Sequence, residues 1–388
     1  IKMLGLTSPY ILMTDENIPA VRGASQAYGL SFVPGTWVES IQITKGAGSV
    51  INGYESISGQ INYEVLKPAN DIPFFLNAYG STDSRYELNA HFNQKYSDKL
   101  SSTLFIHGNT RIGKNDMNND GFLDNPIGKQ VNILNRWQYT DAEKGWVSFL
   151  NLRYMNDEKQ AGEVNFNPDL DKFTTNAWGS EINTEKIEIS NKTGYVFPEM
   201  PYQSFGFQNS FQSHKQESYF GLNQYNIHQK SYYSKLLFNS IISNTKNKFT
   251  TGLNFNYDVY DEQVALNFTQ DFSRIDNSIG AFFEYNYDNL ENLSLSAGVR
   301  VDSHNLLGTF ITPRVHARYT PWEKSALRVS FGRGKRAANI FAEKPALATS
   351  SIPIRRGKRD NYYGVPRKFE PDNDHADRAR KEGTLRTC

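Results

Sequence analysis

Regular alternation of apolar and polar residues over long segments limits the possible folds of this chain more than any other feature. In residues 249–259 the odd positions read Phe, Thr, Leu, Phe, Tyr and Val, whereas the even positions read Thr, Gly, Asn, Asn and Asp. A repeat of two residues places the two kinds of side chain on opposite faces of a β-strand. About thirteen such segments lie between residues 73 and 335, and many are near ten residues long. Strands of about 9–11 residues are long enough to cross a bilayer, whereas soluble strands usually have about 5–6 residues.

The connections between these segments alternate between short and long. Short polar turns are predicted at 97–99, 140–144, 198–201, 243–246, 288–292 and 320–324. Longer loops are predicted at about 111–128, 156–181, 213–224, 260–274 and 303–308. Short turns at one end and long loops at the other are typical of an outer-membrane barrel. A soluble β-sandwich or propeller also alternates, but we find no blade-like internal repeat.

Composition excludes several other classes. No run of about 18 apolar residues occurs, which excludes a helical membrane protein. The single cysteine, Cys388, excludes an intramolecular disulfide and a Cys-based zinc site. With 42 Lys+Arg against 41 Asp+Glu, the net charge of +1 gives no argument for a nucleic-acid partner. We therefore predict an all-β, antiparallel transmembrane barrel, with its apolar side chains facing lipid and aromatic residues at the strand ends.

A glycine-rich motif precedes the alternating region. Residues 38–67 read VESIQITKGAGSVINGYESISGQINYEVLK, in which a strand leads to Lys45-Gly46 and a second strand begins at Gln60. Glycine permits positive φ and close approach of two backbones. A phosphate-binding loop is disfavoured because no Lys-Ser or Lys-Thr follows the glycines and no clear βαβ context surrounds them.

This motif closely resembles the end of the plug domain of TonB-dependent outer-membrane receptors. In that family a Val-Glu-x-Ile-x-hydrophobic-x-Lys/Arg-Gly segment leads to a Tyr-Gly or Asn-Gly turn and then to Gly-x-Ile-Asn. The matching positions here are Val38, Glu39, Gly46, Gly53 and Gly59. Upstream, ILMTDENIPAVRG (11–23) resembles the plug's strand-turn Asp-Gly-x-Pro element, with Glu16-Asn17 in place of Asp-Gly. Residues 310–343 resemble a barrel hairpin of the same receptors, especially those of Bacteroidetes-type bacteria.

The resemblance implies an incomplete set of domains. Residues 1–72 are expected to be the C-terminal part of a plug, and residues 73–343 the N-terminal part of a barrel, with about thirteen of a presumed 22 strands. The family's TonB box is not found in this chain. Residues 344–388 carry 11 Lys/Arg against 6 Asp/Glu and match no barrel strand. We interpret them as an atypical basic tail that is either disordered or out of register with the family.

The resemblance also implies function and partners. The parent receptor would capture a ferric siderophore, or a related metal or cobalamin complex, at the outer face of the bacterial outer membrane. It would import that complex to the periplasm with energy from TonB, without enzymatic chemistry and without a required cofactor. The expected partners are TonB, outer-membrane lipid and the metal chelate, with no nucleic acid. The glycan-importing branch is less favoured because segment 53–59 lacks that branch's usual pattern. A porin-type channel and an outer-membrane barrel enzyme are the alternatives.

Two kinds of charged residue are candidates for a role in this function. By resemblance, Lys45 is the basic residue that pairs with barrel carboxylates and latches the plug; an ordinary exposed turn lysine is the alternative. Several arginines fall on the polar face of predicted strands, where they either bridge to the plug or form an electropositive lining for an anionic ferric complex. These are Arg300, Arg314, Arg318, Arg328 and Arg333.

An acidic loop is a candidate structural calcium site. Residues 115–124 read NDMNNDGFLD, so that Asp116, Asn118, Asp120, Phe122 (through its carbonyl) and Asp124 occupy positions 1, 3, 5, 7 and 9 of a calcium loop. The bidentate Glu of position 12 is replaced by Ile127, so that another carboxylate would have to complete the site. A solvated Asn/Asp turn is the alternative interpretation.

Overall fold

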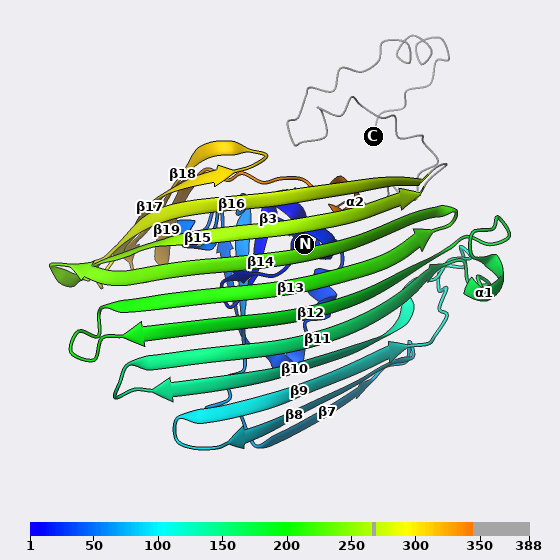
Figure 1. Ribbon diagram of the computed structural model, residues 1–388, viewed down its shortest axis with the longest axis horizontal. Coiled ribbons are helices and arrows are strands. Elements are labelled where there is room, and N and C mark those ends of the chain that lie inside the picture. The colour runs from blue at the N-terminus through cyan, green and yellow to red at the C-terminus, as the bar shows by residue number, and fades with distance from the viewer. Residues whose placement is uncertain (266–268, 344–388) are drawn as a thin grey trace, which may run out of the picture. The chain divides into compact units, whose positions relative to one another are not determined.

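A thirteen-stranded antiparallel sheet forms the larger part of the structure, a computed structural model that describes residues 1–265 and 269–343 (Figure 1). The strands pair in sequence order, each with the next. They are β7 (Phe74–Gly80), β8 (Arg85–Lys95), β9 (Leu100–Arg111), β10 (Ile127–Asp141), β11 (Trp146–Gly162), β12 (Gly179–Val196), β13 (Ser204–Phe220), β14 (Asn223–Ile242), β15 (Asn244–Ala265), β16 (Thr269–Asp288), β17 (Leu293–His304), β18 (Gly308–Trp322) and β19 (Ser325–Gly332). The prediction of about thirteen antiparallel strands is confirmed. β7 and β19 are the two edges of this sheet.

The two faces of the sheet have the polarity expected of a membrane barrel. In the middle of β15, Leu253 is 52% exposed on the outer face, whereas its neighbour Asn254 is 4% exposed on the inner face. The same pattern continues through Phe255 and Tyr257 outside and Asn256 inside. Apolar side chains that point away from the lumen are suited to lipid. No helix in the part of the chain described here is long and apolar enough to cross a membrane.

Toward the end of the sheet that carries the long loops, this polarity reverses. Beyond Val259 the outer face of β15 presents Asp261 and Gln263, whereas Tyr260 and Val264 are buried on the inner face. The inward apolar residues of four strands form a cluster: Ile182, Phe220, Tyr225, Ile227, Tyr260 and Val264, with Ala24 of the N-terminal region. The strands therefore continue beyond the apolar band as a water-facing sheet with its own small core.

This extension corrects two of the predicted loops. The loops expected at 213–224 and 260–274 are largely strand, because β13 and β14 are joined by residues 221–222, and β15 and β16 reach residues 265 and 269. The loop expected at 303–308 is only residues 305–307. Long connections occur at 112–126 and at 163–178, which contains helix α1 (Pro168–Asp171). We call this the loop end of the sheet. The predicted short turns are all present at the opposite, turn end, at 96–99, 142–145, 197–203, 243, 289–292 and 323–324.

Residues 1–72, which we call the plug, form a small mixed sheet in the order β4-β3-β6-β5. The strands of this sheet are β3 (Ile11–Asp15), β4 (Ile18–Pro19), β5 (Val38–Lys45) and β6 (Gly59–Val65), and β1 (Lys2–Met3) pairs with β2 (Leu6–Thr7) in a separate two-stranded sheet. The plug also contains the 3₁₀ helices η1 (Ser8–Tyr10), η2 (Gly23–Ser25), η3 (Gly29–Phe32), η4 (Gly35–Trp37) and η5 (Val50–Asn52). β3 and β6 are parallel, and the other pairs are antiparallel. Glu16 and Asn17 join β3 to β4 with positive φ at both positions, as in a type I′ turn.

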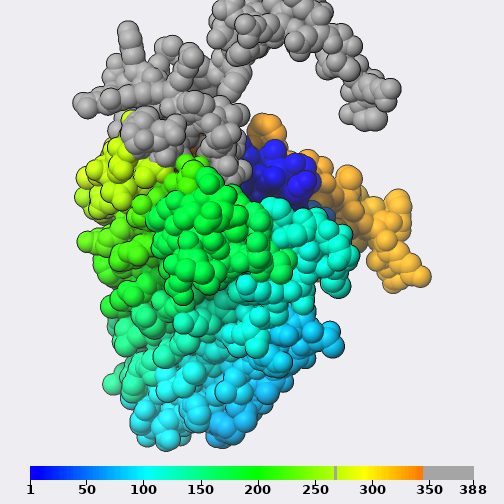
Figure 2. Space-filling model, turned by 90° about the vertical axis from the view of Figure 1, so that its right-hand side faces the viewer, coloured from blue at the N-terminus to red at the C-terminus, as the bar shows by residue number. Residues whose placement is uncertain are grey.

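The plug lies against the inner face of the large sheet, where its first residues appear behind the strands in Figure 1. One contact is apolar: Trp37 and Val65 of the plug pack with Phe105 and Leu134 of β9 and β10. Figure 2 faces the loop end, and there the N-terminal residues, in dark blue, reach the surface beside the last strands. The plug is therefore accessible from the loop end. The predicted basic tail, 344–388, lies outside the described residues.

Candidate functional site

We call the thirteen-stranded sheet the wall. Side chains on its inner face bind the backbone of the glycine-rich segment of the plug, residues 46–59. Arg314 of β18 donates to the carbonyl oxygens of Ser49, at 2.7 Å, and Ser56, at 3.2 Å. Arg300 of β17 donates to the carbonyl of Val50 at 3.3 Å. Both guanidinium groups are almost fully buried, so that each needs such acceptors in place of water. These two arginines therefore bind the plug, which supports the plug-bridging interpretation for them.

The same segment also donates hydrogen bonds to the wall. The carboxylate of Glu284 on β16 accepts from Ser49 Oγ at 2.6 Å and from the amide of Val50 at 3.2 Å. His316 of β18 lies 2.7 Å from the carbonyl oxygen of Gly48. η5 therefore lies against β15–β18, where residues 48–50 make polar contacts with β16–β18 and Val50 packs close to Gly298.

Glu16 forms a second junction, with β10 and β12. Its side chain is 2% exposed and lies 2.6 Å from Arg136 of β10 and 3.0 Å from Lys192 of β12. The backbone amide of Val65 also donates to it, at 3.3 Å. Burial alone would raise the pKa of Glu16, but the two cations lower it below its ordinary value. Glu16 is therefore a buried carboxylate that forms ion pairs with two cationic side chains of the wall.

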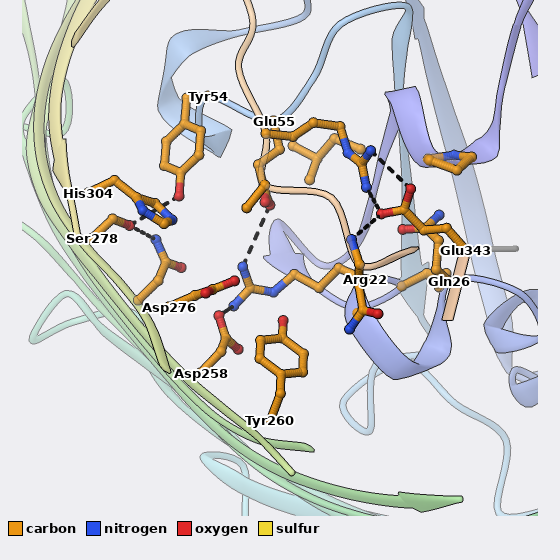
Figure 3. Close-up of a pocket in the computed structure, with 18 of the residues that line it drawn as sticks. Arg22, Gln26, Tyr54, Glu55, Asp258, Tyr260, Asp276, Ser278, His304 and Glu343 are labelled. Atoms are coloured by element: carbon orange, nitrogen blue, oxygen red, sulfur yellow. Dashed lines mark hydrogen bonds and ion pairs between the residues drawn. The ribbon is translucent and has the colours of Figure 1, made fainter. Parts of the chain in front are cut away.

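Arg22 forms a third junction, near the loop end. Its guanidinium lies 2.5 Å from Asp258 of β15 and 3.6 Å from Glu55 of the plug (Figure 3). Burial would lower the pKa of Arg22, but Asp258 and then Glu55 raise it above its ordinary value, so that the group stays charged. The adjacent η2 is fixed as well, because Gln229 accepts from the amide of Ala24 at 2.8 Å.

A small pocket surrounds Arg22 between the plug and the wall (Figure 3). Its cavity measures about 40 Å³, which is space for a few water molecules. The lining comes from the plug, from β15–β17 and from the segment after β19, and it includes Tyr54, Asp276, Ser278 and His304. Tyr54 Oη donates to Ser278 Oγ at 3.3 Å. The pocket is thus a polar site at the loop-end apex of the plug.

Residues 333–343, which we call the strap, cover this pocket and end in the short helix α2 (Ile340–Glu343). Asn339 is buried and donates its side-chain amide to Glu262 of β15 at 2.6 Å. Phe341 packs against Tyr225 and Phe272. The amide of Lys335 donates to the carbonyl of Tyr54 at 2.9 Å. The strap therefore joins the plug apex to the wall.

The predicted plug motif is spread along the plug sheet. Lys45 ends β5 as an exposed residue, with no ion pair among the described residues, so its role as a latch stays a prediction. Val38 begins β5, and Glu39 pairs with Lys67 at 2.8 Å. Gly46 and Gly53 have positive φ. A side chain at Gly59 would meet Met3 and the carbonyl of Thr44, so that only glycine fits there.

The acidic loop lies at the loop end, between β9 and β10. Its carboxylates accept from its own backbone: Asp116 from Gly121 at 2.9 Å, Asp120 from Phe122 at 2.9 Å, and Asp124 from Met117 at 2.8 Å. Asn118 accepts from the amide of Asp120. Within the described residues no three His, Cys, Asp or Glu side chains are gathered closely enough to hold a metal. Calcium binding by this loop stays a prediction.

Sequence reasoning did not single out Glu16, Arg22 or the strap. A charged residue that ends or follows a short apolar strand, as Glu16 and Arg22 do, was the available signal. Of the five predicted lumen arginines, Arg318, Arg328 and Arg333 are exposed near the β19 edge, in contrast to Arg300 and Arg314.

Comparisons with known proteins agree with this architecture. Residues 44–350 match the family model described as "TonB dependent receptor-like, beta-barrel". Among solved structures, the siderophore receptor PirA from Pseudomonas aeruginosa is similar, with a TM-score of 0.64 and 14% identity over 87% of this chain and 56% of that chain. The alcaligin outer membrane receptor FauA from Bordetella pertussis has a TM-score of 0.64 and 12% identity, over 84% and 55%. The outer membrane transporter YddB from Escherichia coli has a TM-score of 0.64 and 10% identity, over 88% and 55%.

The chain thus spans about half the length of these structures. No curated protein matches it in a sequence comparison. The family match nevertheless covers most of the chain, and the open thirteen-stranded sheet with a plug on its inner face agrees with it. The chain therefore belongs to the TonB-dependent receptors, which are outer-membrane β-barrel receptors and transporters rather than enzymes.

Proposed function

We propose that the protein to which this chain belongs captures a ferric siderophore, or a related metal or cobalamin complex, outside the cell. It then imports the complex to the periplasm with energy from TonB. The observation that carries this proposal is the polar character of the interface between plug and wall. Arg300, Arg314, Glu284, Arg136 and Asp258 all bind the plug through hydrogen bonds or ion pairs. Such contacts can be exchanged for water, which suits a plug that must shift during transport.

The location of the pocket supports the same proposal. It lies at the loop end, between the plug and the inner face of the sheet and beneath the strap. The names of two similar structures, PirA and FauA, describe a siderophore receptor and an alcaligin receptor. These names support an iron complex as the substrate class.

Uptake of radiolabelled iron tests the proposal. Cells that carry the intact gene should accumulate ferric siderophore under iron limitation, and cells deleted for it should lose this uptake for at least one complex. Uptake should also stop when TonB is deleted or when the proton gradient is collapsed. If the purified protein conducted ions freely in planar bilayers and supported uptake without energy, a porin-type channel would be the better description.

A further inference from the structure

The glycine-rich segment contains the one Asn-Gly sequence of the chain, Asn52-Gly53. In such a sequence the backbone nitrogen of glycine can attack the side-chain carbonyl carbon of asparagine, because glycine has no side chain to shield that nitrogen. The attack closes a succinimide ring with loss of ammonia, and water then opens the ring to a carboxylate. Asn52 is therefore a chemically labile position at the interface between the plug and the wall.

The backbone around Asn52 has room for this reaction. Asn52 ends η5, and Gly53 follows it with φ of 114°, outside any helix or strand. The amide of Gly53 makes one long hydrogen bond, to the carbonyl of Val50 at 3.4 Å. A Cβ atom placed on Gly53 would meet no other atom within 4 Å, so open space surrounds this peptide. An asparagine within a strand lacks such freedom, because ladder hydrogen bonds fix its backbone.

A buried lysine of the wall lies beside the carbonyl group that is attacked. Lys235 of β14 is 1% exposed, and its Nζ lies 3.5 Å from Asn52 Oδ1 and 3.3 Å from the carbonyl oxygen of Asn17. Among the described residues, no carboxylate lies within ion-pair distance of this amine. Negative charge develops on Oδ1 when the carbonyl carbon is attacked, and a donor beside that oxygen stabilises it. Lys235 therefore lies where it can promote the reaction.

A polar cavity adjoins the same side chain. It measures about 230 Å³ and lies between the plug and the wall, and only polar side chains and glycine line it. Such a cavity is suited to hold water. The Asn52 amide nitrogen, which is the leaving group, donates to Asn17 Oδ1 at 3.2 Å, and both residues line the cavity. The cavity thus supplies water to the reaction and takes up the ammonia.

We propose that Asn52 is a deamidation site at which Lys235 directs the product to aspartate and then pairs with it. In the first step the Gly53 nitrogen bonds to Cγ of Asn52, the bond from Cγ to Nδ2 breaks, and ammonia leaves with the proton of the Gly53 amide. In the second step water adds to Cγ, the bond from Cγ to the Gly53 nitrogen breaks, and a proton of the water returns to that nitrogen.

The position of Lys235 determines which carbonyl of the ring water attacks. Attack at Cγ restores the normal backbone and gives aspartate, whereas attack at the backbone carbonyl of Asn52 gives isoaspartate. Lys235 contacts the Cγ carbonyl oxygen and makes no hydrogen bond to the backbone one. The product carboxylate then faces a buried amine that has no other carboxylate, and charge-assisted hydrogen bonds are stronger than neutral ones. This inference goes beyond solute import and does not depend on which solute is taken.

Mass spectrometry of the folded protein tests the inference. Outer-membrane vesicles from cells that carry the intact gene are incubated near neutral pH and then digested after Glu residues in acidic buffer. The digest yields residues 40–55, in which Asn52 is the one asparagine, and residues 56–64, in which Asn62 is. Peptide 40–55 should be converted with time, and synthetic standards should show aspartate in excess of isoaspartate. Peptide 56–64 should stay intact, because Asn62 lies within β6 and precedes the bulky Tyr63.

Two comparisons separate the role of Lys235 from the lability of Asn-Gly itself. In the same protein unfolded in urea, Asn52 loses its contact with Lys235, so isoaspartate should exceed aspartate as it does in unstructured peptides. In folded Lys235→Met, conversion should be about tenfold slower, because one charge-assisted hydrogen bond is lost. Lys230→Met, on the exposed outer face of the same strand, should change neither the rate nor the product.

The pairing with Lys235 is tested by Asn52→Asp, which installs the product directly. This variant should raise the urea midpoint for protease cleavage within residues 1–72, and an unchanged or lower midpoint would overturn the pairing. The deamidation itself would be overturned if Asn52 stayed intact in folded protein over the time in which the unfolded protein is half converted. The directing role of Lys235 would be overturned by isoaspartate in excess in the folded protein, or by equal conversion in Lys235→Met. None of these outcomes bears on iron uptake, which is measured separately.

Discussion

At the scale of single residues, Glu16 is the clearest example of how the plug is held. It sits in a tight turn with φ of 49°, which is uncommon for a residue with a long side chain. Its carboxylate is nevertheless fixed by Arg136, Lys192 and the amide of Val65. A buried charge is tolerated only where such partners replace water. The turn therefore places a carboxylate where the wall supplies two cations.

Substitution of Glu16 should loosen the plug. Glu16→Ala leaves the buried Arg136 without its counter-ion, and removal of one partner of a buried pair typically costs about 3–5 kcal/mol. We expect a lower urea midpoint for protease cleavage within residues 1–72 in outer-membrane vesicles. Glu217→Ala, which breaks an exposed pair, should change stability by less than about 1 kcal/mol. An unchanged urea midpoint for Glu16→Ala would show that the ion pairs of Glu16 do not hold the plug in place.

Asp15 should make docking of the plug depend on pH. Burial, followed by the charges of Glu16 and Glu188, raises the pKa of Asp15 to about 7, although Arg153 and a hydrogen bond from Tyr63 oppose the shift. A raised carboxyl pKa stabilises the docked state below the unfolded pKa of 3.8, and this stability is lost as the pH rises through about 7. The urea midpoint should therefore fall between pH 5 and pH 8.

Asp15→Asn provides the control for this effect. The amide cannot ionise, so that the fall in midpoint between pH 5 and pH 8 should be largely abolished. The lowered pKa of Glu16 acts with the opposite sign, but only below its ordinary value of 4.5, outside this range. The same slope in the variant and in the parent protein would assign the pH dependence to another group.

At the scale of secondary-structure elements, the strap should act as a cover for the loop-end pocket. Asn339→Ala leaves the buried Glu262 without its amide donor, which typically costs about 1–3 kcal/mol and should make the open state about tenfold more populated. The chain has one cysteine, so Cys388→Ser gives a background for labelling. In that background, a maleimide should label Ser278→Cys, inside the pocket, faster when Asn339→Ala is added.

A second buried serine distinguishes a moving strap from a loosened plug. Ser210 lies on the inner face of β13 and is as buried as Ser278, but it does not line the pocket. Labelling of Ser210→Cys should not respond to Asn339→Ala. Equal acceleration at both positions would mean that the whole plug loosens, and no acceleration at Ser278→Cys would mean that the strap does not limit access.

The strands show which parts of the fold can be predicted from local sequence. Alternation within β15 identifies a strand because the polarity of each residue indicates the face of the sheet on which its side chain lies. The loop expected at 260–274 was wrong because the alternation changes phase there: at Tyr260 the inner face becomes apolar as the outer face becomes polar. The loop expected at 213–224 was wrong because both faces of β13 are polar there, with His214 and Gln216 inside and Lys215 outside. A pattern search that expects one polarity interprets such a change as the end of a strand.

The candidate site could be predicted less well, for a related reason. The plug motif was recognisable because the local packing requires glycine at positions such as 59, where no side chain fits. The junctions of Glu16 with Arg136 and of Arg22 with Asp258 join residues far apart in sequence. Their formation depends on how the plug is seated against the wall, which no local pattern records. Lys45 followed the family motif, yet its partners cannot be read from the sequence.

At the scale of the whole molecule, two different solvents determine the surface. Around the apolar band the outer face carries Leu253 and Phe255, whereas the lumen is filled with polar groups that meet the plug. Nearer the loop end the sheet is arranged like that of a soluble protein, with a small core that includes Ala24 of the plug. The plug is thus held mainly by polar contacts with the inner face of the sheet, and apolar packing is added around Trp37 and Val65 and around Ala24.

The position of the apolar band predicts how a charge on the outer face affects assembly. On β15 the outward residues run from Phe249 to Val259 before Asp261 begins the polar zone, so Leu253 lies near the middle of the band. An arginine on the lipid-facing side at the bilayer midplane costs about 2–4 kcal/mol. Leu253→Arg should therefore lower the fraction that shows heat-modifiable gel mobility. Met117→Arg, in the loop between β9 and β10, should assemble as well as the parent protein. Equal assembly of both variants would contradict the placement of this face in lipid.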